Sequence, residues 1–115
     1  MSYYTSFRYA ASGIWELVRN HANVRLMGIA TLGVMAAGLY LNLAAADWCL
    51  LVLVTALVWV AEGFNTALEC LCNKVCTEQD PLIKKSKDTA AGAVLLAVIA
   101  SVVVGILVFY RYALG

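Results

Sequence analysis

The sequence has little charge and almost no proline, and this shortage of charge excludes ordinary soluble folds. Only 13% of the 115 residues are charged, 63% are hydrophobic, and there is one proline. Soluble domains average about 25% charged and about 45–50% apolar residues. The same hydrophobicity excludes disorder, and a net charge of +1 offers no basic stripe for nucleic acid. The composition indicates a single short domain embedded in lipid.

Charged residues are absent from three segments, which are residues 26–46, 48–61 and 89–110. A bilayer core needs about 20 apolar helical residues, so the first and third segments are long enough alone. The middle segment is long enough only if its helix continues through Glu62 towards Glu69. We therefore predict spans at about 26–46, 48–69 and 89–110. These spans are helices, because backbone polar groups must be paired in hydrocarbon and the continuous apolar runs do not fit a barrel.

Residues before Leu26 contain no apolar run of the kind that a cleavable signal requires. They favour instead an amphipathic helix at about residues 5–20 that lies on the membrane surface. One face is apolar and the opposite face is polar, with Phe7, Ala10, Ala11, Ile14, Leu17 and Val18 on the first and Arg8, Ser12, Glu16 and Arg19 on the second. A helix packed on the rest of the protein is the alternative, and both interpretations can hold together.

The basic residues predict the orientation in the membrane. Seven of the eight lie on one side of the predicted spans, namely Arg8, Arg19, Arg25, Lys74, Lys84, Lys85 and Lys87, and only Arg111 lies on the other. Since basic residues collect on the cytoplasmic side, we expect a cytoplasmic N-terminus and an external C-terminus.

Two further patterns concern packing. Three of the four cysteines form a C-x-C-x₃-C pattern at Cys70, Cys72 and Cys76, which leaves a soft-metal site open beside the simpler interpretation as small apolar fillers. No histidine lies nearby, and a cytoplasmic position disfavours disulfides. Small residues recur every fourth position on the third span, at Thr89, Ala93, Ala97, Ser101 and Gly105. Such seams bring membrane helices together, and we expect part of this surface to pack on another copy of the chain.

Three polar residues share one face of the middle span. Glu62, Asn65 and Glu69 are spaced i, i+3 and i+7, and Glu62 lies about 21 Å along the helix from Trp48. Inserting a charged side chain costs about 2.5–3.5 kcal/mol of free energy at the bilayer centre and less near the bilayer edge. Carboxyl groups kept at such a depth usually face a bundle interior and serve function. Pairing with Arg25 purely for assembly is the alternative.

The depths of the two acids favour different chemical roles for them. Desolvation raises a carboxyl pKa, which favours the deeper Glu62 as general base, whereas Glu69 is better placed as a ligand for Mg²⁺. Lys87 and Asp88 add a cation and an acid at the start of the third helix, at the same level. Taken singly, Asp88 could be a helix N-cap and Lys87 a snorkelling anchor. Together with the acids they predict a phosphate and metal site that faces the cytoplasm, although no P-loop or kinase glycine loop is present.

The run E62-G-F-N65-T-A-L-E69, with P81-L and K87-D88-T-A-A-G-A-V-L, resembles the prokaryotic membrane diacylglycerol kinase family and its undecaprenol kinase branch. The N-terminal F7-R8-Y9-A10, G13-I-W15 and N20-x-x-x-x-R25 also match, so the resemblance covers nearly the whole chain. It implies an all-α integral membrane homotrimer, with one amphipathic surface helix and three spanning helices per protomer. It also implies transfer of the γ-phosphate of ATP, with Mg²⁺, to a membrane lipid alcohol, either undecaprenol or diacylglycerol.

The resemblance also implies roles for residues. It makes Glu62 the general base with Asn65 as its companion, and Glu69 a metal ligand. The implied nucleotide contacts are Tyr9, Glu69, Glu78, Gln79, Asp80, Lys87 and Asp88, and the residues expected to line the lipid are Arg8, Trp15, Asn23, Arg25, Trp48 and Glu62.

Two residues depart from the family pattern. His21 stands where a second metal-binding Glu is usual, and Asn73 stands where an Asp is common. An imidazole suits softer ions than Mg²⁺. Both changes therefore predict weaker Mg²⁺ binding, or coordination that passes to Asp88 and the phosphates.

Two other functions compete with a lipid kinase. A small homo-oligomeric transporter could use Glu62 as a proton-coupled carboxylate, but it favours an acid at the membrane centre and usually four spans. A purely structural membrane subunit would leave the buried acids unexplained.

Overall fold

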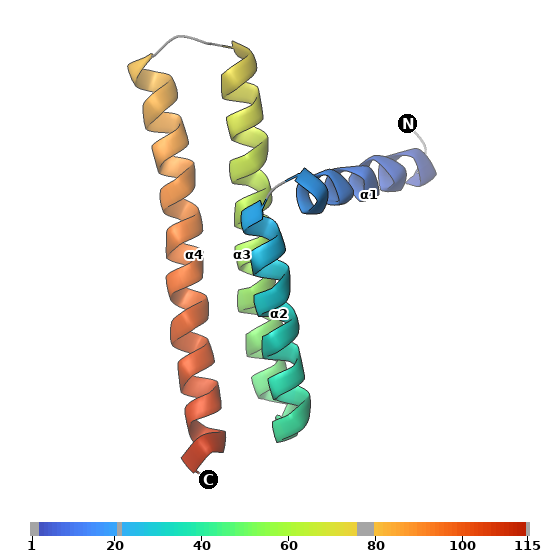
Figure 1. Cartoon of the computed structure of the whole chain (residues 1–115), viewed down its shortest axis with the longest axis vertical. Coiled ribbons are helices and arrows are strands. Elements are labelled where there is room, and N and C mark those ends of the chain that lie inside the picture. Colours follow the sequence, from blue (N-terminus) through green and yellow to red (C-terminus); the bar gives the residue numbers. More distant parts are fainter. Residues whose placement is uncertain (1–2, 21, 76–79, 115) are drawn as a thin grey trace. The chain divides into compact units, whose positions relative to one another are not determined.

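The computed structural model describes residues 3–20, 22–75 and 80–114, and every regular element in these ranges is an α-helix. Four helices follow one another along the chain, which confirms the predicted all-α fold (Figure 1). Three of them are long and apolar enough to cross a membrane. The chain divides into two compact units, Met1–Ala36 and Ala37–Gly115, and each unit is described by itself.

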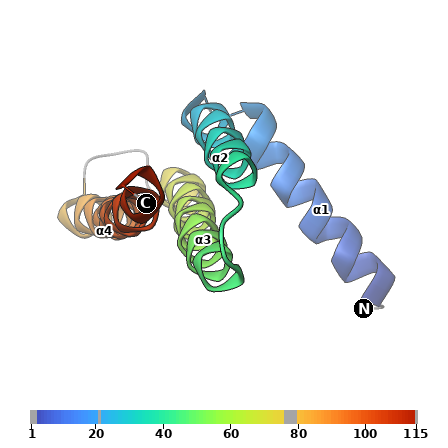
Figure 2. The same ribbon diagram turned by 90° about the horizontal axis from the view of Figure 1, so that it is seen from below.

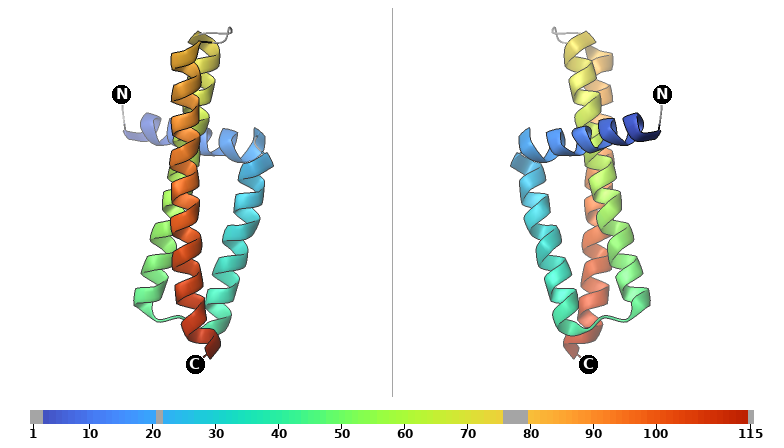
Figure 3. Two further views of the ribbon diagram at one scale, coloured as in Figure 1. Left: turned by 90° about the vertical axis from the view of Figure 1, so that its left-hand side faces the viewer. Right: turned by 90° about the vertical axis from the view of Figure 1, so that its right-hand side faces the viewer.

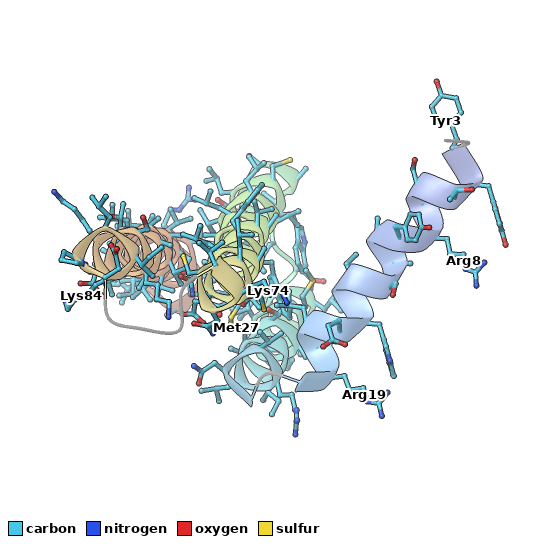
Figure 4. All side chains as sticks on the ribbon, turned by 90° about the horizontal axis from the view of Figure 1, so that it is seen from above. Tyr3, Arg8, Arg19, Met27, Lys74 and Lys84 are labelled. Atoms are coloured by element: carbon cyan, nitrogen blue, oxygen red, sulfur yellow. The ribbon has the colours of Figure 1, made fainter. Side chains whose placement is uncertain are left out.

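The first unit contains α1, Tyr3–Asn20, and most of α2, Ala22–Leu41. The two helices meet at a steep angle (Figure 3), and the Arg25 side chain lies at this corner, where its Nη2 donates to the carbonyl of Arg19 at 3.0 Å. Arg8 and Arg19 project from the same face of α1 (Figure 4). The helical bounds of α1 agree with the predicted amphipathic segment, and its apolar residues Phe7 and Ile14 are exposed.

The second unit opens with the end of α2, which closes in a Schellman motif. The amide of Leu43 donates to the carbonyl of Gly38, and the amide of Asn42 donates to the carbonyl of Leu39. Asn42 has φ of +53°, the left-handed conformation that Asn tolerates better than most residues. α2 therefore ends at Leu41, five residues before the limit predicted from charge alone.

The predicted middle span lies within α3, Ala45–Val75. The helix continues without a break through Glu62 and Glu69, as the middle span required. Its beginning packs on the end of α2 at one close approach. A Cβ on Gly38 would lie 2.7 Å from Cη2 of Trp48 and 3.1 Å from Cδ1 of Leu43, so only glycine leaves room for this indole ring.

The last helix, α4, spans Pro81–Leu114 and begins eight residues before the predicted span. Asp80 is its N-cap, because Oδ1 accepts hydrogen bonds from the amides of Leu82 at 2.8 Å and Ile83 at 3.3 Å. Proline is favoured directly after such a cap, since its missing N–H has no helical partner there anyway. The interpretation that Asp88 begins this helix is therefore wrong, because Asp88 lies two turns inside it.

α3 and α4 run antiparallel and side by side (Figures 1 and 2). The carboxyl end of α3 and the amino end of α4 lie together (Figure 3), and Lys74 and Lys84 both lie at this end (Figure 4). We call it the lysine end. The opposite end contains Asp47 and Arg111, and Glu62 lies between the two ends, near the middle of α3.

Candidate active site

The acidic face of α3 comes from helical periodicity. Glu62, Asn65 and Glu69 lie within one unbroken helix, so their spacing places all three on one side of it. Exposure rises along this face, because Glu62 and Asn65 are half-buried and Glu69 is exposed. The carboxyl of Glu62 is thus in the less hydrated position of the two.

Asn65 carries an unusual polar atom. Among the described residues, its Oδ1 is buried and has no hydrogen-bond partner. A buried acceptor without a partner costs about 1–3 kcal/mol. Asn65 lies one turn from Glu62 on the same face of α3, so this unpartnered oxygen adjoins the acidic face.

Lys87 joins the acidic helix to α4. Its Nζ donates to Oδ1 of Asn73 at 2.7 Å, across 14 residues of sequence. Asn73 follows Glu69 by four residues, so the two are neighbours on α3, about 6 Å apart along its axis. The structure thereby brings the Lys87 ammonium to the helix turn that follows Glu69.

Asp88 is held by its own helix. Its Oδ2 accepts a hydrogen bond from Nζ of Lys84 at 2.7 Å, and both side chains of this i, i+4 ion pair are exposed. α4 is about 51 Å long, longer than a bilayer core, and the pair precedes its charge-free segment. The hydrogen bond to Asp88 raises the pKa of Lys84 above its usual value. Asp88 is thus a carboxylate partly balanced by a neighbouring ammonium.

The other residues predicted to contact the nucleotide lie in different parts of the chain. Asp80 lies at the lysine end, and its Oδ1 caps α4. Tyr9 is exposed on α1, in the first unit. Glu78 and Gln79, and the predicted metal ligand His21, lie outside the described residues.

Residues predicted to line the lipid fall into two groups. Arg8, Trp15, Asn23 and Arg25 all belong to the first unit and are exposed. Trp48 lies near the beginning of α3, where its ring packs against Gly38, about 31 Å along the helix from Glu69. The structure therefore places Trp48 at the end of α3 opposite the lysine end.

The described residues contain no group of three or more His, Cys, Asp and Glu side chains that could hold a metal ion. Glu69 is then the exposed carboxylate best placed as a ligand. Mg²⁺ commonly takes one or two protein carboxylates and completes its shell with phosphate and water oxygens, so a single Glu69 beside a nucleotide is a chemically adequate donor. Cys70 is an exposed free thiol and Cys72 a buried one, and Cys76 lies outside the described part.

Sequence reasoning missed two residues of this site, Asn73 and Lys84. Lys84 could have been found, because Asp80-Pro81 is a helix-start signal and a helix from there places Lys84 four residues before Asp88. Asn73 was noted only as a departure from the family pattern. Its contact with Lys87 depends on how α3 and α4 pack, and no local signal reports it.

The chain is similar to known prokaryotic lipid kinases. The family model of prokaryotic diacylglycerol kinase matches residues 8–109. The chain is 32% identical over 107 residues to an undecaprenol kinase of Bacillus subtilis, covering 93% of this chain and 87% of that protein. It is 41% identical over 101 residues to a diacylglycerol kinase of Synechocystis, covering 87% of this chain but 58% of that protein. A diacylglycerol kinase of Escherichia coli is 31% identical over 98 residues, covering 82% of this chain and 80% of that protein.

The family match and the three helices that could span a membrane define an all-helical membrane protein of the lipid kinase class. The chain belongs to the prokaryotic diacylglycerol kinase family, whose model covers nearly its whole length.

Proposed function

We propose that this chain transfers the γ-phosphoryl group of ATP to the hydroxyl of a membrane lipid alcohol, undecaprenol or diacylglycerol, at the cytoplasmic interface of the bacterial inner membrane. One observation carries the proposal. The hydrogen bond from Lys87 to Asn73 brings the Lys87 ammonium of α4 beside the acidic face of α3. A phosphate from water and an alcohol from lipid can meet only where charged groups and apolar helix surface adjoin.

The chain's residues supply proton transfer and charge stabilisation. Glu62 accepts the proton of the lipid hydroxyl, and Asn65 is its polar companion on the same face of α3. The Lys87 ammonium offsets charge that develops on the transferred phosphoryl group. Phosphoryl transfer depends mainly on positioning and electrostatics, so these three groups account for the main protein contributions.

Mg²⁺ is the expected cofactor, with Glu69 as its protein ligand among the described residues. The bound ion would supply neutralisation of the phosphate oxygens. Asp88 is a second candidate ligand, although its hydrogen bond with Lys84 competes for the carboxylate. His21 is proposed as a further ligand on the sequence alone.

The first unit is proposed to serve the lipid. α1 carries exposed aromatic residues at Tyr9 and Trp15, which favour the interface between lipid and water. The cations Arg8 and Arg25 belong to the same unit and suit anionic headgroups. A lipid alcohol can then reach Glu62 from the side of the membrane while ATP approaches from water.

A homotrimer is part of the proposal. α4 exposes large apolar side chains on several sides, among them Leu95, Leu96, Ile106 and Leu107. Ala97 is buried in the seam of small residues on the same helix, and exposed members of this seam allow close approach of another copy.

The transporter alternative is not supported, since the family and the named relatives are lipid kinases. Three candidate spans, rather than the four usual for such transporters, agree with this conclusion.

The test is phosphorylation of a lipid panel by the purified protein. The protein is incubated in mixed micelles with labelled ATP and undecaprenol, diacylglycerol or a simple long-chain alcohol, with Mg²⁺, Mn²⁺ or Zn²⁺. Labelled lipid phosphate that depends on a divalent ion supports the proposal, and Glu62→Gln is the matched inactive control. Proton-coupled uptake without ATP use, or no product with any lipid, contradicts it.

A further inference from the structure

We infer that Asn73 is a positioning residue for the nucleotide, because it holds the Lys87 ammonium where a triphosphate binds. The inference rests on the proposed function and deepens it. The sequence pattern relates Asn73 only to the strength of Mg²⁺ binding, and its proposed role as a positioning residue comes from its contact with Lys87 of α4.

The contact joins two different helices. Nζ of Lys87 lies 2.7 Å from Oδ1 of Asn73, which is the distance of a strong charge-assisted hydrogen bond. Lys87 is half-buried and Asn73 is exposed. The stem of the lysine therefore lies against the helix pair while its charged end is at the surface, where a water-borne anion can reach it.

The acceptor is neutral, and this matters for the charge of the site. Lys84, one turn earlier on α4, donates to the carboxylate of Asp88, so its charge is balanced by an opposite charge. Lys87 donates to an amide oxygen, which fixes the ammonium without balancing it. Of these two lysines, Lys87 thus keeps the larger net positive field for an incoming phosphate.

Fixing a lysine has an energetic benefit for binding. A flexible lysine loses rotamer entropy when a ligand immobilises it, a cost that corresponds to about threefold to tenfold in affinity. In this structure the hydrogen bond with Asn73 restricts the side chain before the ligand arrives. Loss of the amide should therefore weaken ATP binding through Lys87, while proton transfer at Glu62 continues.

A double-mutant cycle tests the inference. The full-length protein, Asn73→Leu, Lys87→Met and the double variant are assayed in mixed micelles with MgATP and whichever lipid of the panel the parent phosphorylates fastest. Asn73→Leu removes the acceptor at similar side-chain size, and Asn73→Ala replaces it if Leu impairs folding. Ser86→Ala is the matched control, because Ser86 lies at the same end and donates to Leu82 within its own helix.

We expect Asn73→Leu to raise the KM for ATP about threefold to tenfold, as the ordering cost predicts. Its KM for lipid should stay within about twofold of the parent, and any fall in kcat should accompany the rise in the KM for ATP, because Lys87 also offsets charge on the transferred phosphoryl group. In the Lys87→Met background the same substitution should have no further effect on the KM for ATP, and Ser86→Ala should change nothing.

Other results would overturn the inference. An equal rise in KM in both backgrounds shows that Asn73 acts independently of Lys87, and a fall in kcat alone shows a different role. ATP affinity is also measured by thermal shift in all four proteins. A parent that binds ATP but phosphorylates no lipid defeats the proposed function, whereas the cycle of ATP affinities still decides the role of Asn73.

Discussion

The hydroxyl of Tyr112 donates a hydrogen bond to Oδ2 of Asp47 at 2.7 Å, joining the last turn of α4 to the first turn of α3. The same Tyr112 oxygen accepts a hydrogen bond from the amide of Ala44 at 2.8 Å. Arg111 donates to the other carboxylate oxygen of Asp47. Asp47 is 5% exposed, and as an acid in the first turn of α3 it also suits the positive end of the helix dipole.

Tyr112→Phe should lower the free energy of unfolding by about 1–3 kcal/mol, because the buried Asp47 carboxylate loses one of its hydrogen-bond donors. Lipid kinase activity of the folded protein should be unchanged, since Asp47 lies about 33 Å along α3 from Glu69. Reversible unfolding in detergent and the specific activity are measured together. Arg111→Lys, which preserves the charge, is the control, and a Tyr112→Phe protein of parental stability contradicts the prediction.

Gly38→Ala should destabilise the protein by about 1–3 kcal/mol, a typical cost of overpacking. The added Cβ would lie 2.7 Å from the Trp48 ring, which is rigid and held at the turn between α2 and α3. Gly33→Ala is the matched control on the same helix, because no described atom lies within 4 Å of its Cβ position. Equal thermal midpoints for the two variants would show that the close approach is unimportant.

Asp80→Ala should destabilise the protein by about 0.5–2 kcal/mol through loss of the N-cap of α4. Asp80→Asn should restore most of this stability, since an amide oxygen also caps. We expect Asp80→Asn to keep the parental KM for ATP as well, because capping is the role that the hydrogen bonds of Asp80 support. A raised KM with restored stability would instead assign Asp80 a direct contact with the nucleotide.

Glu62→Gln should lower kcat about 10²–10⁴-fold, the usual contribution of a general base. The substitution preserves size and hydrogen bonding, so the thermal midpoint and the KM for ATP should remain close to parental. Initial rates with saturating lipid and MgATP provide the measurement. A variant that phosphorylates lipid at the parental rate removes Glu62 from the role of base.

The sequence predicted the apolar helices well, because the hydrophobicity of each segment is a local property of the chain. Three charge-free segments predicted three apolar helices, and the extension through Glu62 and Glu69 was confirmed by α3. The helix ends differ from the predicted span limits, since α4 begins at Pro81 and α2 ends at Leu41. The charge pattern reports where lipid can lie, whereas capping by Asp80 and the left-handed Asn42 decide where the helix hydrogen bonds begin and end.

The part of the candidate site that lies on a single helix could also be predicted from the sequence. The shared face of Glu62, Asn65 and Glu69 follows from helical periodicity alone, so the sequence by itself determined it, together with the family and the number of apolar helices. Only the tertiary structure decided that Lys87 contacts Asn73 and that Tyr112 contacts Asp47. Those pairs join distant parts of the chain through the packing of α3 against α4, and nothing in the local pattern of either residue encodes that alignment.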